Sequence, residues 1–316
     1  MKALVGVLGF FLACAVNAQS FPSKPLKFIV PYPPGGGTDI LGRALGQLIG
    51  ESVGQPVIIE NRAGANGAVG SEVVAKSAPD GYTVGFAGSS THVLNPLLYK
   101  LTYDAVTDFT PITTVATTGF VIIVKPDSEF KSLGNLLSQA RANPGKLSYG
   151  SFGNASAGHL AGEMFKYTAK VDMVHIPYKG SAPGQMDVMG GVIPLMFSDM
   201  SAMPHVKSGK LRALAVTGPK RLAAYPDIPT VAEAGVPGYD AQGWFAVYAP
   251  AGVPRPVLDR LNAEFVKAIN NPSMRERMIG LGLEPATTTP EGLAALMRAD
   301  HEKWVRLIAE AKIKAE

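Results

Sequence analysis

The chain of 316 residues carries 29 Lys and Arg against 25 Asp and Glu, which leaves a net charge of +4 at pH 7. The basic residues are scattered and no aromatic–basic stripe accompanies them, so a nucleic-acid partner is not expected. Apolar residues make up 47% of the chain, which is enough for substantial cores, and the length is typical of two domains.

Cysteine and histidine usage argues against thiol and metal chemistry. Cys14 is the only cysteine and lies in the N-terminal segment described next, so the rest of the chain has no thiol for a disulfide, a thiolate metal site or a nucleophile. The five histidines follow neither HExxH nor a comparable spacing. The sequence therefore predicts no metal and no other cofactor.

Residues 1–18 have the composition of a secretory signal peptide. Lys2 gives a positive start, residues 3–16 form an apolar stretch too short to span a bilayer, and small residues precede an expected cut after Ala18. A lipid anchor on Cys14 is the alternative, but Phe11 is a poor match at its place in a lipoprotein signal. Export as a soluble protein is the favoured prediction.

The first predicted strand, residues 27–31, leads into a glycine-rich bend. After this bend, which includes Gly37, apolar residues recur at helical spacing from residue 40 to residue 49. Thr38 or Asp39 is the expected N-cap of this helix. Because the glycines leave the first amides uncovered and the helix dipole is positive at this end, the loop favours an anion, either a carboxylate or a phosphate.

Nucleotide-binding motifs do not match this loop. A P-loop would need Lys and then Ser or Thr after Gly42, where the chain has Arg43 and Ala44. A dinucleotide fingerprint would need glycine in place of Ile40. A purely structural turn remains the alternative, and the charge of Asp39 would repel an anion unless its side chain points away or acts through water.

Farther along the chain, short apolar strands alternate with amphipathic helices. Strands are expected near residues 57–59, 83–87, 147–151 and 211–216, and the pattern becomes mostly helical from Pro254 onward. Such alternation is typical of an α/β fold with largely parallel sheets that helices cover on both faces.

Two extended runs, residues 120–125 and 244–250, are expected to cross between two lobes. Each run ends at or beside a proline. If both cross, residues 19–122 and 247–316 form lobe 1, and residues 123–246 form lobe 2. Because ligands of open α/β sheets bind beyond the C-terminal ends of the strands, the two lobes would face each other across a cleft.

Small polar residues and glycines follow several of the expected strands, where they suit a carboxylate without a buried lysine or arginine. These segments are residues 88–92, 150–159, 174–183 and 197–201. An ordinary helix cap is the alternative role for Ser156, Ser181 and Ser201, with Ser181 the expected N-cap of its helix. Their repeated position at strand ends is what favours a binding site.

An exported serine esterase or hydrolase is the alternative function. The segment around Ser156 resembles a G-x-S-x-G nucleophile elbow, but Asn154 stands in place of the first glycine. Asp199, followed by His205 or His301, has the chain order of such hydrolases. Because this order arises readily by chance, a binding protein that is not an enzyme is the preferred interpretation.

Seven short motifs occur in order along the chain: residues 31–39 (PYPPGGGTD), 60–67 (ENRAGANG), 78–83 (APDGYT), 149–151 (YGS), 175–180 (HIPYKG), 209–216 (GKLRALAV) and 229–235 (PTVAEAG). Together they resemble the Bug family, the periplasmic solute receptors of tripartite tricarboxylate transporters. The resemblance covers nearly the whole chain and is specific as a set, although no single motif is specific.

The resemblance implies a two-lobed periplasmic-binding-protein (Venus flytrap) fold. Each lobe would be a mostly parallel sheet flanked by helices, and two hinge strands would join the lobes. It also implies a periplasmic receptor, expected to be a monomer, that closes on a small carboxylate. Such a receptor hands its ligand to the membrane permease subunits of a tripartite tricarboxylate transporter.

The resemblance also implies binding residues in both lobes. Those in the first lobe are Tyr32, Gly37, Thr38, Asp39, Ser89, Ser90 and Thr91, and those in the second are Asn154, Ala155, Ser156, Ser181, Ala182 and Asp199. In such receptors backbone amides and ordered waters near the glycine loop hold the carboxylate, so Asp39 would orient a water. Phe152 and Tyr178 are candidate cleft walls, with a place in the core as the alternative.

The resemblance leaves the identity of the carboxylate open. Family members are associated with di- and tricarboxylates, amino acids, nicotinate-like compounds and aromatic dicarboxylates. Phe152, His159 and Trp244 favour an aromatic acid, such as terephthalate or a benzoate- or nicotinate-like acid, over an aliphatic mono- or dicarboxylate. A protonated His92 or His159 would assist a second carboxylate, whereas a neutral helix histidine is the commoner case.

Overall fold

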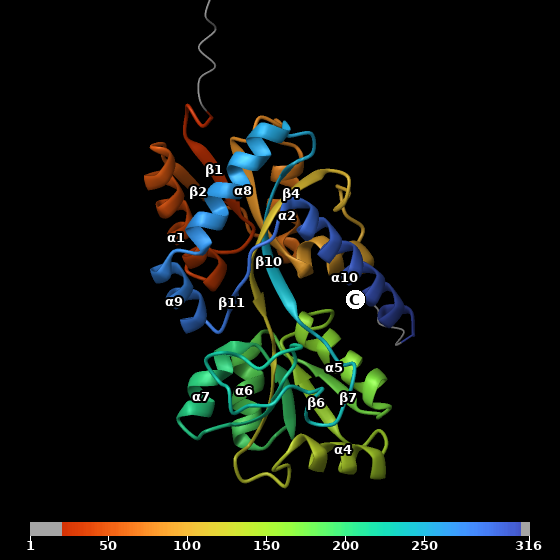
Figure 1. Ribbon diagram of the computed structural model, residues 1–316. Coiled ribbons are helices and arrows are strands. Elements are labelled where there is room, and N and C mark those ends of the chain that lie inside the picture. The colour runs from red at the N-terminus through yellow and green to blue at the C-terminus, as the bar shows by residue number, and fades with distance from the viewer. Residues whose placement is uncertain (1–20, 311–316) are drawn as a thin grey trace, which may run out of the picture.

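Two mixed sheets with helices packed on them organise residues 21–310, the part of the chain that the computed structural model describes (Figure 1). The α/β class and the two-lobed arrangement predicted from the sequence are confirmed. The prediction that the sheets are mostly parallel is wrong, because each sheet contains antiparallel as well as parallel pairs of strands. The predicted signal peptide, with Cys14, lies outside the described residues.

The first sheet has six strands in the order β11-β4-β10-β3-β1-β2. β1 pairs in parallel with β2 and β3, while β10 runs antiparallel between β3 and β4. The strands are β1 (Leu26–Val30), β2 (Val57–Asn61), β3 (Thr83–Gly88), β4 (Phe109–Thr118), β10 (Gly243–Pro250) and β11 (Glu284–Pro285). The helices that go with this sheet are α1 (Gly37–Val53), α2 (Ala68–Ala75), α3 (Asn95–Leu98), α8 (Arg255–Ile269), α9 (Pro272–Gly280) and α10 (Pro290–Glu310), with short turns η1 (Ala65–Gly67) and η2 (Ser90–Leu94).

The second sheet has five strands in the order β7-β6-β8-β5-β9. β6 pairs in parallel with β7 and β8, and β5 is antiparallel to β8 and β9. The strands are β5 (Val121–Val124), β6 (Ser148–Ser151), β7 (Val174–Pro177), β8 (Leu195–Ser198) and β9 (Arg212–Val216). The helices are α4 (Leu133–Ala142), α5 (Ala157–Ala169), α6 (Ser181–Gly190) and α7 (Met203–Lys207), with the turn η3 (Met200–Ala202).

Helix α1 packs directly on the first sheet. The spacing of Leu41, Leu45 and Ile49 gives the helix one apolar face, and all three side chains are buried. Gly46 on this face allows the close approach, because a Cβ atom there would lie 2.9 Å from Cδ1 of Ile59 on β2. The packing places the N-terminus of α1 at the end of β1, where the glycine-rich loop lies.

The chain passes between the sheets just before β5 and just before β10. The runs expected to cross, residues 120–125 and 244–250, instead each form a strand within one sheet. The sheets change at residues 119–120 and within residues 217–242, while the lobe limits at 122 and 247 remain a prediction.

Thr217 joins the two connections between the sheets. Its hydroxyl accepts a hydrogen bond from the Phe120 N–H (2.7 Å) and donates one to the Ala241 carbonyl (2.9 Å). The backbone of Thr217 bonds to the same two residues, and its side chain is fully buried. Both connections are therefore held together at a single residue.

The strand pairing determines which ends of the sheets face the crossing. Gly88, the last residue of β3, pairs with Phe245 near the start of β10, where the chain has just entered the first sheet. Ser198, the last residue of β8, pairs with Val121, where the chain has just entered the second sheet. Strands β1 and β2 run with β3, and β6 and β7 run with β8, so the C-terminal ends of both sets point toward the other lobe.

Candidate functional site

The glycine-rich loop presents free amides at the end of β1. Helix α1 begins at Gly37 and its N-cap is Gly36, so the N-cap expected at Thr38 or Asp39 is wrong. Among the hydrogen bonds of residues 21–310, none uses the backbone N–H of Gly36, Gly37 or Thr38. These three donors and the positive end of the α1 dipole together favour an anion.

Asp39 lies buried in the first turn of α1 and stabilises this loop. Its carboxylate accepts hydrogen bonds from the Gly35 N–H (2.9 Å), Arg43 Nε (3.0 Å) and Asn61 Nδ2 (2.9 Å). The hydrogen bond from Arg43 is the main reason why the pKa of Asp39 is lowered to about 2, while burial acts in the opposite direction. The Asp39 carboxylate, whose charge was expected to repel an anion, therefore points into the protein, where Arg43 compensates its charge.

Three loops of the first lobe meet at Gly67. A Cβ atom there would lie 2.6 Å from Cγ2 of Thr91 and 3.5 Å from Cζ of Tyr32, and its φ of +89° favours glycine. Tyr32 is partly buried and comes from the β1 loop, whereas Thr91 comes from the segment after β3. The fold thus brings Tyr32 and Thr91 together at Gly67, although the three residues are far apart in the sequence.

The three hydroxyl residues after β3 have different roles. Thr91 is fully buried, and its Oγ1 accepts from the Gly88 N–H (3.0 Å) and donates to the Gly88 carbonyl (3.1 Å). Ser89 is also buried, and its Oγ accepts from the Trp244 N–H (3.4 Å). Only Ser90 of the three is partly exposed. Of these three side chains, that of Ser90 is therefore the one accessible to solvent.

In the second lobe, Ser156 ends the loop after β6 and begins α5. Its Oγ accepts from the His159 N–H (3.2 Å) and donates to the Gly153 carbonyl (2.6 Å), which confirms the helix-cap interpretation. Asn154 in the same loop is partly exposed. As at α1, the first turn of this helix starts at the end of a strand that points toward the other lobe.

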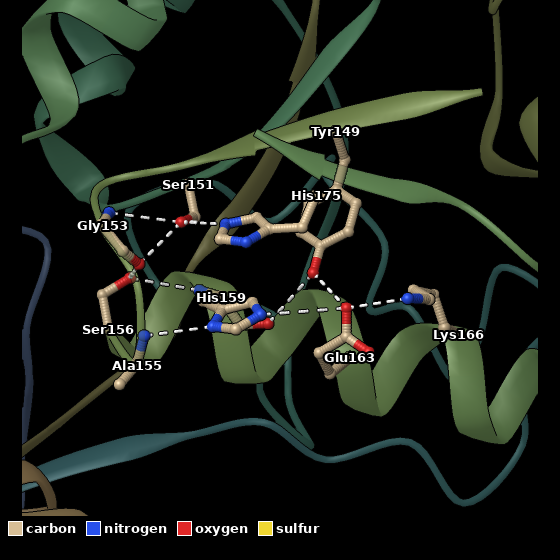
Figure 2. Close-up of polar contacts among 9 residues, drawn as sticks. All are labelled: Tyr149, Ser151, Gly153, Ala155, Ser156, His159, Glu163, Lys166 and His175. Atoms are coloured by element: carbon tan, nitrogen blue, oxygen red, sulfur yellow. Dashed lines mark hydrogen bonds and ion pairs between the residues drawn. The ribbon is translucent and has the colours of Figure 1, made fainter. Parts of the chain in front are cut away.

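Figure 2 shows His159 beside this loop, joined to it by a hydrogen bond. Its Nδ1 accepts a hydrogen bond from the Ala155 N–H (3.1 Å), and Ala155 has a positive φ of 53°. The ring stacks on His175 at 3.8 Å between centroids, and His175 Nε2 lies 2.7 Å from Ser151 Oγ. Because Nδ1 is an acceptor, the His159 ring must be neutral, and its Nε2 is 3.9 Å from Glu163 Oε1.

Glu163 completes this buried group. It accepts from the Tyr149 hydroxyl (2.6 Å) and pairs with Lys166 Nζ (2.9 Å). Burial lowers the pKa of His159, and burial together with His159 and Lys166 lowers the pKa of His175 to about 3. Both rings are therefore neutral at pH 7.

Buried neutral histidines make the folding stability depend on pH. His92, whose pKa burial lowers to about 3, belongs to this class with His159 and His175. His92 and His175 bind a proton in the unfolded chain below about pH 6.5 but not in the folded one, so stability is lost as the pH falls from there toward about 3. The lowered pKa of His159 acts in the same direction. We expect His175→Phe to lower the slope of unfolding free energy against pH by about 1.4 kcal/mol per pH unit between about pH 4 and 6. Urea unfolding at several pH values measures this slope, and equal slopes in both proteins would contradict the prediction.

Ser181, Ala182 and Asp199 lie where α6 meets the end of β8. The N-cap of α6 is Gly180, so the cap expected at Ser181 is wrong. Ser181 is the first residue of the helix, and its Oγ donates to Asp199 Oδ2 (2.5 Å). The other Asp199 oxygen accepts from the N–H and the hydroxyl of Ser201, while Ala182 is exposed.

The two candidate aromatic walls are both partly buried. Phe152 packs against Phe120 with the ring centroids 5.9 Å apart. The Tyr178 hydroxyl donates to Asp187 Oδ2 (2.7 Å), and both rings belong to the apolar cluster of the second lobe. Much of each ring therefore packs in the core, which is the alternative role that the sequence left open for Phe152 and Tyr178.

Sequence reasoning did not single out Arg43 and Asn61, although they hold Asp39 in place. Arg43 had a local signal, because it stands four residues after Asp39 on one helix face. Asn61, at the end of β2, had none beyond its position at a strand end. His175 and Ser151 were likewise quoted only within motifs, because their contact with each other spans 24 residues.

Residues 21–310 contain neither a membrane-spanning helix nor a cluster of metal-ligating side chains. None of the helices there combines the length and the apolar character that crossing a bilayer requires. Within the same residues, no three His, Cys, Asp or Glu side chains gather as a metal site would require.

Comparison with known proteins extends these observations. The model of the family described as "Tripartite tricarboxylate transporter family receptor" matches residues 41–313. The UPF0065 protein in the tcbD–tcbE intergenic region of Pseudomonas sp. (strain P51) is 38% identical over 99% of this chain and 95% of its own length. Protein BugT of Bordetella pertussis is 35% identical over 99% of both chains. Among solved structures, R. palustris Rpa4515 with adipate is 34% identical, has a TM-score of 0.79, and matches over 93% of this chain and 99% of its own.

Proposed function

The chain belongs to the tripartite tricarboxylate transporter receptor family, the family to which the sequence motifs pointed, and on that premise we propose that it binds a small carboxylate between its two lobes. As a member of a receptor family it is a solute receptor rather than an enzyme. The esterase alternative also has no support at Ser156, whose Oγ contacts the Gly153 carbonyl and the His159 backbone N–H instead of a histidine ring.

The observation that carries the proposal is the set of free amides at Gly36, Gly37 and Thr38. They stand at the end of β1, on the side of the first sheet that points toward the second lobe. Neutral donors at a helix N-terminus stabilise a carboxylate without the cost of burying a lysine or arginine. Asp39 supports them, because both its oxygens are already engaged within the protein.

The second lobe has two further helix N-termini at strand ends. Helix α5 begins directly after the β6 loop, and α6 begins shortly after β7, so both helix N-termini lie at strand ends that face the first lobe. We assign the second carboxylate, or the far end of the ligand, to this lobe. The loop residues Asn154 and Ser156, and Ser181 at the start of α6, would contact it when the lobes close.

We propose an aliphatic dicarboxylate as the first ligand class to test, because a structure 34% identical to this chain was solved with adipate. An aromatic carboxylate, such as terephthalate or a benzoate- or nicotinate-like acid, is the second candidate, favoured by the partly exposed ring of Phe152. The ligand would pass to the membrane permease of a tripartite transporter from a monomeric receptor in the periplasm, reached through export by residues 1–18.

We expect adipate or one of these aromatic acids to raise the melting temperature of the protein in proportion to the logarithm of its concentration. A ligand at a hundredfold excess over its Kd adds about 2.7 kcal/mol to the free energy of unfolding. Adipamide, the neutral diamide of the same length, is the matched control and should give no shift. Equal shifts with adipate and adipamide, or none with any carboxylate, would contradict the anion site.

A further inference from the structure

The loop between β6 and α5 follows a backbone path that few residues adopt. Gly153 has a φ of +144° and Ala155 a φ of +53°, so Asn154 lies between two residues of positive φ. For a residue other than glycine the left-handed region costs conformational free energy, and the residue stays there only where its surroundings hold it. Ala155 therefore needs a partner elsewhere in the protein that fixes this turn.

The buried ring of His159 is that partner (Figure 2). Its Nδ1 accepts the hydrogen bond from the Ala155 N–H at 3.1 Å. Because a backbone N–H can only donate, Nδ1 carries no proton, and the proton of the neutral ring is on Nε2, on the side of Glu163. The hydrogen bond to the loop thus depends on an acceptor at one ring position.

A second ring is connected to the other end of the same turn. His175 stacks on His159 with 3.8 Å between the ring centroids and 7° between the ring planes. The Nε2 of His175 lies 2.7 Å from Ser151 Oγ, which accepts from the Gly153 N–H (3.2 Å). The stacked pair is therefore joined to both residues of positive φ, directly at Ala155 and through Ser151 at Gly153.

The turn leaves Asn154 available to a ligand. Asn154 is partly exposed, and among the hydrogen bonds of residues 21–310 none uses its side-chain amide. The hydroxyl of Ser156, by contrast, already donates to the Gly153 carbonyl. Of the two residues of this loop that we assign to the far end of the ligand, Asn154 is therefore the one with an uncommitted side-chain donor, which suits a carboxylate.

We propose that His159 determines the preference of this protein for a dicarboxylate over a monocarboxylate, because it holds Ala155 and so places Asn154 for the far carboxylate. His159 is a positioning residue in this role. It acts through the loop, and its neutral ring brings no charge to the ligand, in contrast to the expectation that a protonated His159 would assist a second carboxylate. The inference rests on the proposed function, since it concerns a ligand bound between the two lobes.

Two substitutions of the same shape separate the hydrogen bond from the rest of the ring. His159→Asn places an acceptor oxygen at the position of Nδ1, whereas His159→Leu places a methyl group there. Both lose the ring and its stacking, so the acceptor distinguishes them. In the ligand-free mature protein, NMR-detected exchange of the Ala155 amide hydrogen should be about tenfold faster in His159→Leu and close to the wild-type rate in His159→Asn.

Calorimetric titration with adipate and with hexanoate tests the preference itself. Hexanoate has the same six carbons as adipate but one carboxylate. We expect His159→Leu to weaken adipate binding by about tenfold and hexanoate binding by less than about twofold, so that the ratio of the two Kd values falls by about tenfold. His159→Asn should restore most of this ratio, which a loss of stability alone would not do.

Each contrary outcome identifies what is wrong. Equal losses of adipate and hexanoate affinity in His159→Leu, or an unchanged ratio, would overturn the role of His159 while the carboxylate site stood. A ratio as low in His159→Asn as in His159→Leu would show that the acceptor at Nδ1 is not what matters, and would overturn it as well. If neither acid binds to the wild type, the proposed function is wrong and this inference falls with it.

Discussion

Replacing Asp39 by alanine is expected to weaken carboxylate binding by about 10- to 100-fold, because the free amides of the glycine-rich loop lose the group that holds them. The substitution removes the acceptor for the Gly35 N–H, Arg43 Nε and Asn61 Nδ2 at once. The loss corresponds to about 1–3 kcal/mol of binding free energy, with a similar loss of unfolding free energy. Calorimetric titration and urea unfolding measure the two effects.

The pKa of Asp39 adds a pH test to this prediction. Because the folded-state pKa is lowered to about 2 from 3.8, the stability contributed by its ionised form is complete above the unfolded value and is lost as the pH falls through about 2. Asp39→Ala should therefore lose stability relative to the wild type at neutral pH and lose less at strongly acid pH. A difference between the two proteins that did not change with pH would contradict this role.

Glu291→Ala is the matched control for Asp39→Ala. Glu291 is also an acidic residue in the first turn of a helix, but it is exposed and pairs with the exposed Arg255. We expect little change in unfolding free energy, because an exposed ion pair contributes little, and no change in affinity. An equal loss in both variants would mean that the helix dipole alone accounts for the effect of Asp39.

Gly70→Ala is expected to destabilise the protein and weaken ligand binding together. Gly70 lies on α2, and a Cβ atom there would be 2.7 Å from Cα of Pro31 and 2.9 Å from the carbonyl oxygen of Arg62. Both are backbone atoms, so the β1 loop must move. The cost is about 1–3 kcal/mol of unfolding free energy, which outweighs the gain of up to about 1 kcal/mol from alanine in a helix. Since Pro31 leads into the glycine-rich loop, we expect a loss of carboxylate affinity as well.

Gly280→Ala separates close packing from helix propensity. Gly280 ends α9, is exposed, and has no atom within 4 Å of the position of a Cβ. Its substitution should leave affinity unchanged and stability equal or higher by up to about 1 kcal/mol. If Gly70→Ala were as stable as Gly280→Ala and bound ligand as tightly as the wild type, the close contact of residue 70 with Pro31 would have no effect on stability or binding, and the prediction would be wrong.

The helix caps show how far local patterns reached. Ser156 caps its helix, one of the two roles that the sequence indicated for it, because its hydroxyl accepts from the N–H of His159 within one helical turn. At α1 and α6 the same reasoning was wrong, because glycines at residues 36 and 180 begin the helices one to three residues earlier. Gly180 adopts a φ of +101°, which favours glycine, and the preference of serine for N-cap positions gives no information about such a backbone turn.

The extended runs before and after the crossing show a second limit. Residues 120–125 and 244–250 were correctly expected to be strands, because β-branched and aromatic residues dominate them. Their assignment to one sheet depends on hydrogen bonds to strands far away in the chain, such as Val121 to Ser198. The pattern of residue types in a strand does not indicate which other strand it pairs with.

The sequence by itself determined the α/β class, the family, and the glycine-rich loop with its uncovered amides, because these depend on residue types within a few positions of one another. Only the tertiary structure decided that Asp39 turns inward toward Arg43 and Asn61, and that His159 holds the Ala155 loop. Each of these pairs stands on separate elements or depends on a particular backbone turn. Burial and hydrogen bonding, not residue type, then decide whether such a group is charged.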